Sequence, residues 1–406
     1  MTSVDVRGPR DVLTEPGLTR WMRLALVLVS RARAGHLTVC IDGAREYRFS
    51  AAGPGPRAAV IVHDQRVARR MFMGGSLGVA EAYLDGDFDS PDLTALVEWA
   101  CINEDVDATL LGKSWYRVAR RLYHVLRGNS RRGSRRNIAS HYDLGNDFYR
   151  RWLDPGMTYS SAIFGAKGED LEAAQVNKYR RLAEILRLEP GQSLLDIGCG
   201  WGGFACFAAR EFNCRVTGIT ISREQFEYAR ARVAELGLLD KVQIELRDYR
   251  DIRDEFDRIV SIEMFEAVGE RYWPVFFNKL RQTLRPGGRA ALQVITIADR
   301  YFEDYRSKMD FIQRYVFPGG MLPSPQTFRD GIRNAGLRLL DESAYGAHYA
   351  RTLSLWRQRF VAAWPDIRGG AFDERFRRMW EYYLCYCEGG FLARSIDVMQ
   401  VAMTRD

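Results

Sequence analysis

Long apolar runs are absent from this 406-residue sequence. The most apolar segment, LALVLV at residues 24–29, lies between arginines at positions 20, 23, 31 and 33. A bilayer span needs about 20 apolar residues, and a secretory signal ends in a small-residue cleavage site. We therefore expect neither at this position, and we interpret the segment as a core or interfacial helix.

Paired cysteines are also absent. The seven cysteines are odd in number and scattered, and only Cys385 and Cys387 lie close together, as a lone C-x-C. Disulfide frameworks have even cysteine sets and zinc sites have paired spacings. The pattern predicts a protein of the reducing cytoplasm without a metal centre.

Acidic residues are missing between Asp107 and Asp143, where nine lysines and arginines occur. The first part of this segment, SWYRVARRLYHVLR, has the periodicity of an amphipathic helix, and the second, GNSRRGSRRN, has the composition of a linker. Basic patches attract the phosphates of nucleic acids or of anionic lipids. The segment is therefore interpreted either as a solvated linker or as a membrane-docking surface, and both interpretations stay open.

The length allows two or three domains at roughly 150 residues each. A composition of 47% hydrophobic and 27% charged residues is ordinary for a globular protein. Before about residue 110, short strand-like and helical runs are mixed, and a helix is expected to begin near Ser90 with Pro91 in its first turn. We predict an N-terminal domain at 1–110, a basic helix and linker at 111–140, and a larger domain at 141–406.

Strand and helix patterns alternate regularly after the basic segment, before the chain becomes aromatic-rich and irregular past residue 300. Ser222 is the expected N-cap of one of the helices. The alternation predicts an α/β fold with a doubly wound parallel sheet. The expected strands are 193–197, 214–220, 241–246, 256–262 and 289–297, with a final one at 396–404.

The glycine-rich stretch LLDIGCGWGG at residues 194–203 follows the first of these strands. It fits the dinucleotide pattern G-x-G-x-x-G and equally fits G-x-G-x-G. A dinucleotide site needs an acid about 20 residues downstream to bind the ribose, and RVTGITIS contains none. Asp196 before the glycines would repel a pyrophosphate and suits the cationic methionine end of S-adenosylmethionine. The stretch therefore favours a methyl-donor site.

Several longer motifs surround this loop, in the order HYDLGNDFYRRWLDPGMTYSSAIF, GITISREQ, RDYRD, MFEAVG, YVFPGGMLP, FVAAWPDI and YYLCYCEGGF. From about residue 141 to the C-terminus the sequence resembles the cyclopropane-fatty-acid synthase family of class I methyltransferases, and GGSLGVAEAYLDGDFDSPDL extends a looser resemblance toward the N-terminus. The resemblance implies a Rossmann-like catalytic domain with aromatic-rich helical insertions at 141–406. It also implies a smaller mixed α/β domain at 1–110 with an accessory, lipid-binding role.

The family transfers the methyl group of S-adenosylmethionine to a double bond in a phospholipid acyl chain. An alkene is a weak nucleophile, so methylation creates a carbocation that the site must stabilise and then deprotonate. The resemblance implies a bound bicarbonate as the base. The catalytic positions carried over are Glu266, Tyr349, Gln293, Ser161, Ile295 and Cys387.

Two of these positions depart from the best-known family pattern. Ser161 stands where many members have cysteine, and Gln293 stands where they have histidine. Glutamine donates a hydrogen bond to an anion but does not titrate. Another branch of the family shares both changes, so the product is open between a cyclopropane ring and a methylene or, after reduction, a methyl branch.

The donor site is carried over in the same way. Thr220 and Gln225 are expected to contact ribose or methionine, and Asp248 and Tyr249 to lie beside the adenine. Thr220, Gln225 and Tyr249 also have plain structural interpretations, as a strand-end, a helix-surface and a core residue respectively. The full set of cofactor positions is Tyr159, Ser160, Asp196, Gly198, Gly200, Gly202, Thr220, Gln225, Asp248 and Tyr249.

The resemblance also implies the partners. We expect unsaturated phospholipid acyl chains at an anionic membrane surface, a cytoplasmic, peripherally membrane-associated location and a homodimer. A nucleic-acid methyltransferase that uses the basic segment is the alternative from another class. It is disfavoured because the chain shows no nucleic-acid-binding module.

Overall fold

The computed structural model describes residues 2–13, 15–43, 45–104, 144–370 and 372–406. The predicted basic helix and linker at 111–140 lie outside the described residues. Within the described chain, residues 2–104, 308–311 and 360–395 form one compact unit, and residues 144–307, 312–359 and 396–406 form a second. The N-terminal unit thus includes two segments that the sequence-based boundaries had placed in the larger domain.

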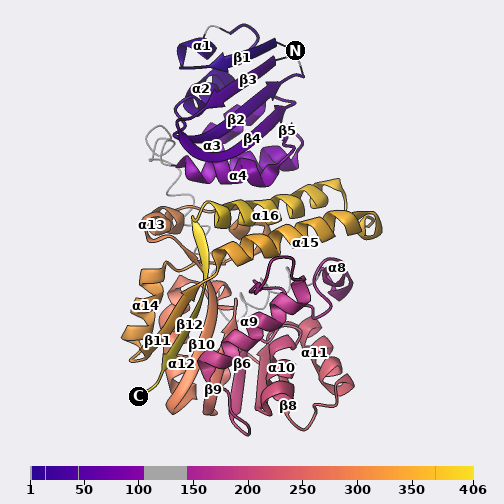
Figure 1. The fold of residues 1–406 in the computed structure, drawn as a ribbon, viewed down its shortest axis with the longest axis vertical. Helices are drawn as coiled ribbons and strands as arrows, with labels where there is room; N and C mark the ends of the chain where they lie inside the picture. Colours follow the sequence, from indigo (N-terminus) through magenta and orange to yellow (C-terminus); the bar gives the residue numbers. More distant parts are fainter. Residues whose placement is uncertain (1, 14, 44, 105–143, 371) are drawn as a thin grey trace. The chain divides into compact units, whose positions relative to one another are not determined.

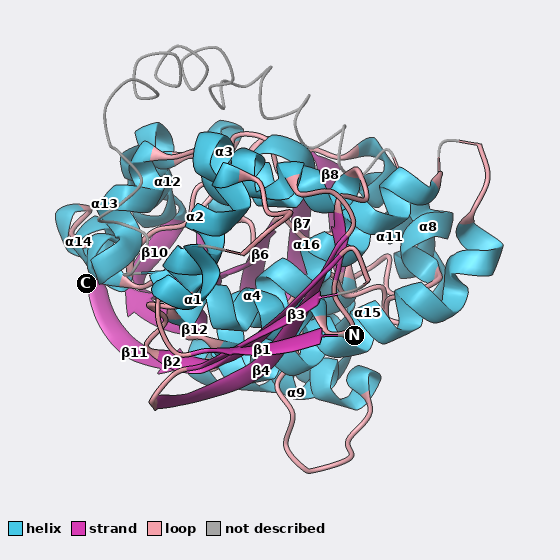
Figure 2. Cartoon of the chain, turned by 90° about the horizontal axis from the view of Figure 1, so that it is seen from above, coloured by secondary structure: helices cyan, strands magenta, loops and turns pink. Residues whose placement is uncertain are grey.

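The N-terminal unit is a small mixed α/β domain built on a five-stranded sheet (Figure 2). Its core joins the inward faces of the strands to the helices, with Tyr47 and Val12 fully buried. Its strands, in spatial order, are β1 (Thr2–Val6), β3 (Arg45–Ser50), β2 (Ala34–Ile41), β4 (Gly53–Val62) and β5 (Phe88–Asp89). Its helices are α1 (Arg10–Leu13), α2 (Arg20–Val29), α3 (Arg66–Leu84), α4 (Leu93–Ile102) and α16 (Glu374–Leu392).

Helix α16 joins this unit because it packs against α4 (Figure 1). The two helices approach closely at Gly389, where an added Cβ would lie 2.8 Å from the Cβ of Val97. The hydroxyl of Thr94 donates to Glu388 at 2.9 Å beside this contact. The predicted start of α4 at Ser90 and Pro91 is wrong, because Asp92 is the N-cap and accepts from the amide of Ala95.

The second unit contains a seven-stranded sheet (Figure 1). Five neighbouring strands, from residues 242–246 at one edge to residues 284–297, run parallel. The final strand of the chain is inserted antiparallel beside them. The predicted doubly wound sheet is therefore confirmed. Its strands, in spatial order, are β8 (Val242–Leu246), β7 (Arg215–Thr220), β6 (Ser193–Ile197), β9 (Phe256–Ile262), β10 (Leu284–Ile297), β12 (Ile396–Thr404) and β11 (Arg338–Ala344).

Helices surround this sheet, and the aromatic-rich region past residue 300 is more regular than its sequence indicated. Ser222 is the N-cap of α11, as predicted, and accepts from the amide of Gln225. The helices are α8 (Asn146–Arg150), α9 (Leu171–Leu186), α10 (Gly203–Phe212), α11 (Arg223–Glu235), α12 (Trp273–Thr283), α13 (Asp299–Ser307), α14 (Pro325–Asn334) and α15 (Gly346–Ile367). Shorter turns are the 3-10 helices η1 (Tyr249–Asp251), η2 (Phe265–Ala267) and η3 (Glu270–Tyr272), and the π-helix η4 (Ile312–Val316).

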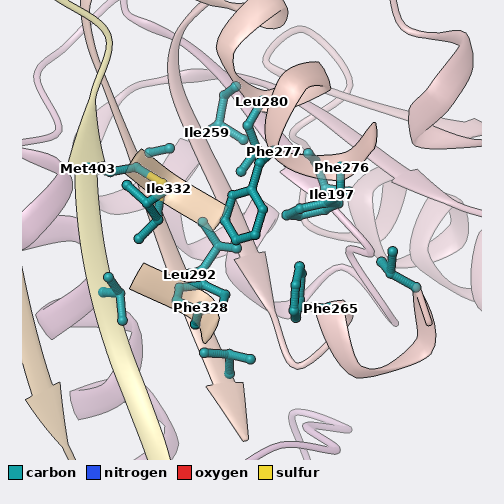
Figure 3. Packing of buried hydrophobic residues seen from close by; sticks show 14 of the residues in the cluster. Ile197, Ile259, Phe265, Phe276, Phe277, Leu280, Leu292, Phe328, Ile332 and Met403 are labelled. Atoms are coloured by element: carbon teal, nitrogen blue, oxygen red, sulfur yellow. The ribbon is translucent and has the colours of Figure 1, made fainter. Parts of the chain in front are cut away.

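Alternate residues of the central strands point to opposite faces of the sheet, and each face has its own apolar cluster. Ile259 and Leu292 pack with α12 and α14 on one face, as Figure 3 shows. Their chain neighbours Val260 and Ala291 pack with α9, α10 and α11 on the other. Burial on both faces is typical of a parallel sheet, and it fixes the carboxyl ends of β6, β9 and β10 where a ligand site of an open α/β sheet is expected.

Candidate active site

Glu263 is the centre of a polar cluster that the sequence analysis did not select. It directly follows β9 and has a left-handed backbone with φ of 50°. Its Oε1 accepts from the amide of Ser161 at 2.8 Å and from Nε2 of Gln293 at 2.7 Å. Its Oε2 accepts from the hydroxyl of Tyr349 at 2.6 Å. Three of the predicted catalytic residues thus meet on a fourth, unpredicted one.

Gln293 is held in one orientation by the neighbouring strand. It pairs across β10 and β12 with Gln400, whose Nε2 donates to its Oε1 at 2.9 Å. The Nε2 of Gln293 is thereby left to face Glu263 and also donates to the carbonyl of Ser161 at 3.2 Å. The hydroxyl of Ser161 donates to the carbonyl of Ala162, so Ser161 contacts Glu263 through its amide.

Glu266 and Ile295 form a second contact beside this cluster. Glu266 lies on η2, and its Oε1 accepts from the amide of Ile295 at 2.5 Å. Its Oε2 is shielded from solvent and has no hydrogen-bond partner among the described residues. The structure thus brings Glu266 and Ile295 together, but neither residue contacts Ser161, Gln293 or Tyr349 through a hydrogen bond that the described chain shows.

The two glutamates lie in different electrostatic surroundings. Removal from water raises the pKa of Glu266 to about 8, and the nearby charge of Glu263 adds to this rise. Removal from water also raises the pKa of Glu263, while its hydrogen bonds from Tyr349, Gln293 and Ser161 oppose the rise. A carboxylate that accepts several hydrogen bonds retains its charge best. The hydrogen bonds therefore favour the charged form of Glu263, whereas Glu266, which accepts fewer of them, is a carboxylic acid at neutral pH.

Replacing Glu266 by glutamine is expected to flatten the pH dependence of stability. The pKa of Glu266 rises from 4.5 to about 8 on folding, so the folded protein holds a proton that the unfolded chain releases between these values. The wild-type protein therefore loses stability as pH rises from about 5 to 8, by at most about 1.4 kcal/mol per pH unit. Glu266→Gln removes this loss. Melting temperatures of both proteins from pH 5 to 9 test it; a constant difference between them contradicts it.

The glycine-rich loop follows β6 and has the geometry that a close ligand needs. Gly198, Gly200 and Gly202 have φ of 80°, 55° and 80°, and Gly202 is the N-cap of α10. An added Cβ at Gly200 would meet no atom within 4 Å. Glycine adopts positive φ without strain and lets a ligand approach the backbone. The loop leaves open the space in which the predicted donor would lie.

Asp196, on β6 before the loop, is buried, and its Oδ2 has no hydrogen-bond partner among the described residues. Burial raises the pKa of its carboxyl to about 7, and Lys178 opposes the rise. An unpaired polar oxygen inside a protein is costly and is expected where a ligand completes the site. A cationic ligand group fits this position, so the residues present fit S-adenosylmethionine.

Lys178 of α9 interacts electrostatically with both Asp196 and Glu263. It is fully buried, and its Nζ donates to the hydroxyl of Ser160 at 2.7 Å. Burial lowers the pKa of Lys178 to about 7, while Glu263, Asp154 and Asp196 oppose the decrease. A lysine in a helix is usually a surface residue, so nothing in the sequence around Lys178 indicated this buried position.

The remaining predicted cofactor residues are buried or partly buried, and each contacts other residues of the chain. The hydroxyl of Thr220 donates to Oε1 of Gln225 at 2.9 Å, which joins the end of β7 to α11. The carboxylate of Asp248 pairs with Arg250 at 2.6 Å. Tyr249 packs edge-on against Phe276 at 5.4 Å between ring centroids. The structure therefore gives Asp248 and Tyr249 structural contacts that exist without a ligand.

Aromatic rings surround Tyr159, the first of the predicted cofactor residues. Its ring centroid lies 5.3 Å from that of Trp356 and 5.5 Å from those of Tyr149 and Trp152. Trp356 in turn meets Tyr349 edge-on at 6.1 Å. Faces of such rings attract positive charge. The aromatic rings therefore form a continuous group from Tyr159 through Trp356 to Tyr349, whose hydroxyl donates to Glu263.

Cys387 belongs to a different compact unit from the other candidates. It lies on α16 in the N-terminal unit, whereas every other predicted site residue lies in the second unit. Its catalytic role stays a prediction from the resemblance.

Comparisons with known proteins identify the family. The family model described as mycolic acid cyclopropane synthetase matches residues 129–401. The chain is 38% identical over 395 residues to tuberculostearic acid methyltransferase UfaA1 of Mycobacterium tuberculosis, covering 93% of this chain and 90% of that protein. It is 35% identical over 397 residues to the cyclopropane-fatty-acyl-phospholipid synthase of Escherichia coli strain K12, covering 95% and 94%.

A solved structure extends the likeness to three dimensions. Mycolic acid cyclopropane synthase CmaA1, complexed with SAH and CTAB, matches with a TM-score of 0.63 and 30% sequence identity. The match covers 67% of this chain and 98% of that chain. The family resemblance inferred from the motifs is confirmed. By the match to the family model and by its identity to these relatives, the chain belongs to the mycolic acid cyclopropane synthetase family of S-adenosylmethionine-dependent methyltransferases.

Proposed function

We propose that this protein transfers the methyl carbon of S-adenosylmethionine to a double bond in an unsaturated phospholipid acyl chain and closes it to a cyclopropane ring. The observation that carries the proposal is the placement of two sites beside each other. Asp196, before the glycine loop, has an Oδ2 without a partner among the described residues. Its carboxyl and that of Glu263 both attract the buried Lys178, which donates to the hydroxyl of Ser160. Names of the relatives, which include a cyclopropane-fatty-acyl-phospholipid synthase, support this substrate class.

The chemistry explains why such a cluster is needed. S-adenosylmethionine supplies an electrophilic methyl group when it is bound. An alkene cannot be deprotonated to an anion before it attacks. The acyl chain that receives the methyl group therefore becomes a carbocation. The carboxylate of Glu263 and the rings of Tyr159, Tyr349 and Trp356 are suited to stabilise that charge where it forms. A base at the same place then removes a proton.

A methylene-branched acyl chain is the second candidate product. It arises from the same cation if the departing proton leaves a new double bond instead of a ring. Two observations favour testing for it. The donors around Glu263 include Ser161 and Gln293 in place of cysteine and histidine, and the relative UfaA1 is named a tuberculostearic acid methyltransferase rather than a cyclopropane synthase.

The site of action is proposed to be an anionic membrane surface. No helix in the described part of the chain is long and apolar enough to pass through a bilayer. We propose peripheral docking through the basic segment at 111–140, with the N-terminal domain as a lipid-binding accessory. The homodimer and the cytoplasmic location remain expectations from the resemblance.

Incubation with methyl-labelled S-adenosylmethionine and vesicles of monounsaturated phospholipid tests the function. We expect labelled fatty acids that have gained one CH₂ and have lost their alkene signals in NMR spectra. Labelled fatty acids that retain alkene protons would show that the product is the methylene-branched chain and not the cyclopropane ring. Vesicles of saturated phospholipid are the matched control and should take up no label. Label that appears only in added RNA or DNA would overturn the lipid proposal.

A further inference from the structure

Glu263 occupies the donors that the family resemblance assigns to a bicarbonate ion. The amide of Ser161, the Nε2 of Gln293 and the hydroxyl of Tyr349 all donate to its carboxylate, at 2.6–2.8 Å. These three donors are thus already bound to the carboxylate of Glu263, which is part of the chain. A free bicarbonate does not fit this site, because the donors that would hold it are engaged.

The neighbouring acid makes a second anion still less favourable. Glu266 lies beside the same cluster, and the charge of Glu263 already contributes to the raised pKa of its carboxyl. Like charges close together inside a protein disfavour one another's ionisation. A bicarbonate placed between these glutamates would add a further negative charge to a region with one buried lysine, Lys178.

Glu263 is itself placed to accept a proton. A carboxylate offers about four acceptor positions, and the described contacts fill three of them. Two are on Oε1 and one is on Oε2, so Oε2 retains an open position. Gln293 cannot titrate, and its orientation is fixed by Gln400. The three donors therefore hold the carboxylate in place without competing for the proton.

We propose that the carboxylate of Glu263 is the proton acceptor of the reaction and replaces bicarbonate, so that turnover needs no dissolved bicarbonate. This inference rests on the proposed function. The π electron pair of the alkene forms the new carbon–carbon bond, and the sulfur–methyl bond breaks with its pair moving to sulfur. The cation is then on the other alkene carbon. A C–H pair of the new methyl group forms the ring bond, and the proton passes to Oε2 of Glu263.

Two substitutions of Glu263 test this assignment. Glu263→Gln retains the shape and an acceptor for Ser161 and Gln293 but has no basic carboxylate. Glu263→Gly empties the cluster, and glycine accepts the left-handed φ of this position without strain. Glu342→Gln is the matched control, because Glu342 pairs with Arg329 in the same unit, outside the site. Binding of S-adenosylhomocysteine verifies that each variant is folded.

Turnover is measured in carbonate-free buffer and after addition of sodium bicarbonate. We expect the wild-type protein and Glu342→Gln to be unaffected by bicarbonate. Glu263→Gln should lower turnover about 100- to 10,000-fold, the range of general-base contributions, and bicarbonate should not rescue it. Glu263→Gly should be equally slow without bicarbonate and at least about tenfold faster with it, since an emptied cluster can bind the ion.

A binding measurement gives a second readout. In NMR spectra with ¹³C-labelled bicarbonate, only Glu263→Gly should show the bound ion. Bicarbonate that binds to or accelerates the wild-type protein would overturn the inference, as would normal turnover of Glu263→Gln. Lack of any bicarbonate response in folded Glu263→Gly would also overturn it, because the cluster would then not be an anion site. If the wild-type protein methylates no lipid at all, the proposed function itself has failed.

Discussion

Replacing Gly200 by valine is expected to weaken binding of S-adenosylmethionine about 100-fold, which corresponds to about 2.7 kcal/mol. Gly200 has a φ of 55°, and an added Cβ would meet no protein atom within 4 Å. The side chain would therefore enter the space over the loop that the donor needs. Isothermal titration calorimetry with S-adenosylmethionine and S-adenosylhomocysteine measures the change.

Gly237 supplies the control for this substitution. It follows α11 with a φ of 67°, and an added Cβ there also meets nothing within 4 Å. Valine at either position has the same left-handed strain, roughly 1–2 kcal/mol. Both variants should therefore lose similar stability, but Gly237→Val should bind the donor normally. Equal donor affinities in the two variants would remove the loop from the donor site.

Asp196→Asn is expected to lower donor affinity by about 10- to 150-fold. The Oδ2 of Asp196 is buried without a partner among the described residues, and a cationic group of the donor would pair with it. Hydrogen bonds to charged groups contribute about 1.5–3 kcal/mol, which gives this range. Asparagine has the same shape, so the fold is kept. Asp341→Asn, at an ion pair with Arg181, is the matched control and should bind normally.

The same residue predicts how donor binding depends on pH. Burial raises the pKa of Asp196 to about 7 in the free protein, so its carboxyl is protonated below that pH. A cationic donor favours the ionised form, and binding below pH 7 must release the proton. Affinity should therefore rise with pH, by at most about tenfold per unit, and level off above pH 7. Asp196→Asn serves as the baseline, because Lys178 titrates in the same range. Equal pH profiles of the two proteins would contradict the assignment.

Much of the catalytic fold could be predicted because its signals are local. The strand at 193–197, the glycine loop and the cap at Ser222 each follow from periodicity or from a short-range backbone requirement. The helical insertions past residue 300 were expected from the family resemblance and not from periodicity, because abundant aromatic residues obscure the helical pattern and in the structure these rings pack on several sides.

Glu263 was missed for a different reason. It is one of two acids in SIEMFEAVG, and the motif comparison drew attention to Glu266. Nothing in the spacing indicates that the backbone at Glu263 turns left-handed. That turn brings its side chain to three donors that are 86, 102 and 30 residues away in sequence. Such convergence depends on the order of the strands and on α15, which the local pattern does not encode.

The pairing of Gln400 with Gln293 also determines which end of the Gln293 amide faces Glu263. A side-chain amide presents either its NH₂ group or its oxygen, depending on how it is rotated. Here Gln400, on the adjacent strand β12, fixes the rotation of the Gln293 amide. A residue at 400 that donated nothing would free the amide to turn, and its oxygen would then oppose the carboxylate it now supports. The direction in which Gln293 presents its dipole thus depends on a fully buried side chain of the adjacent strand.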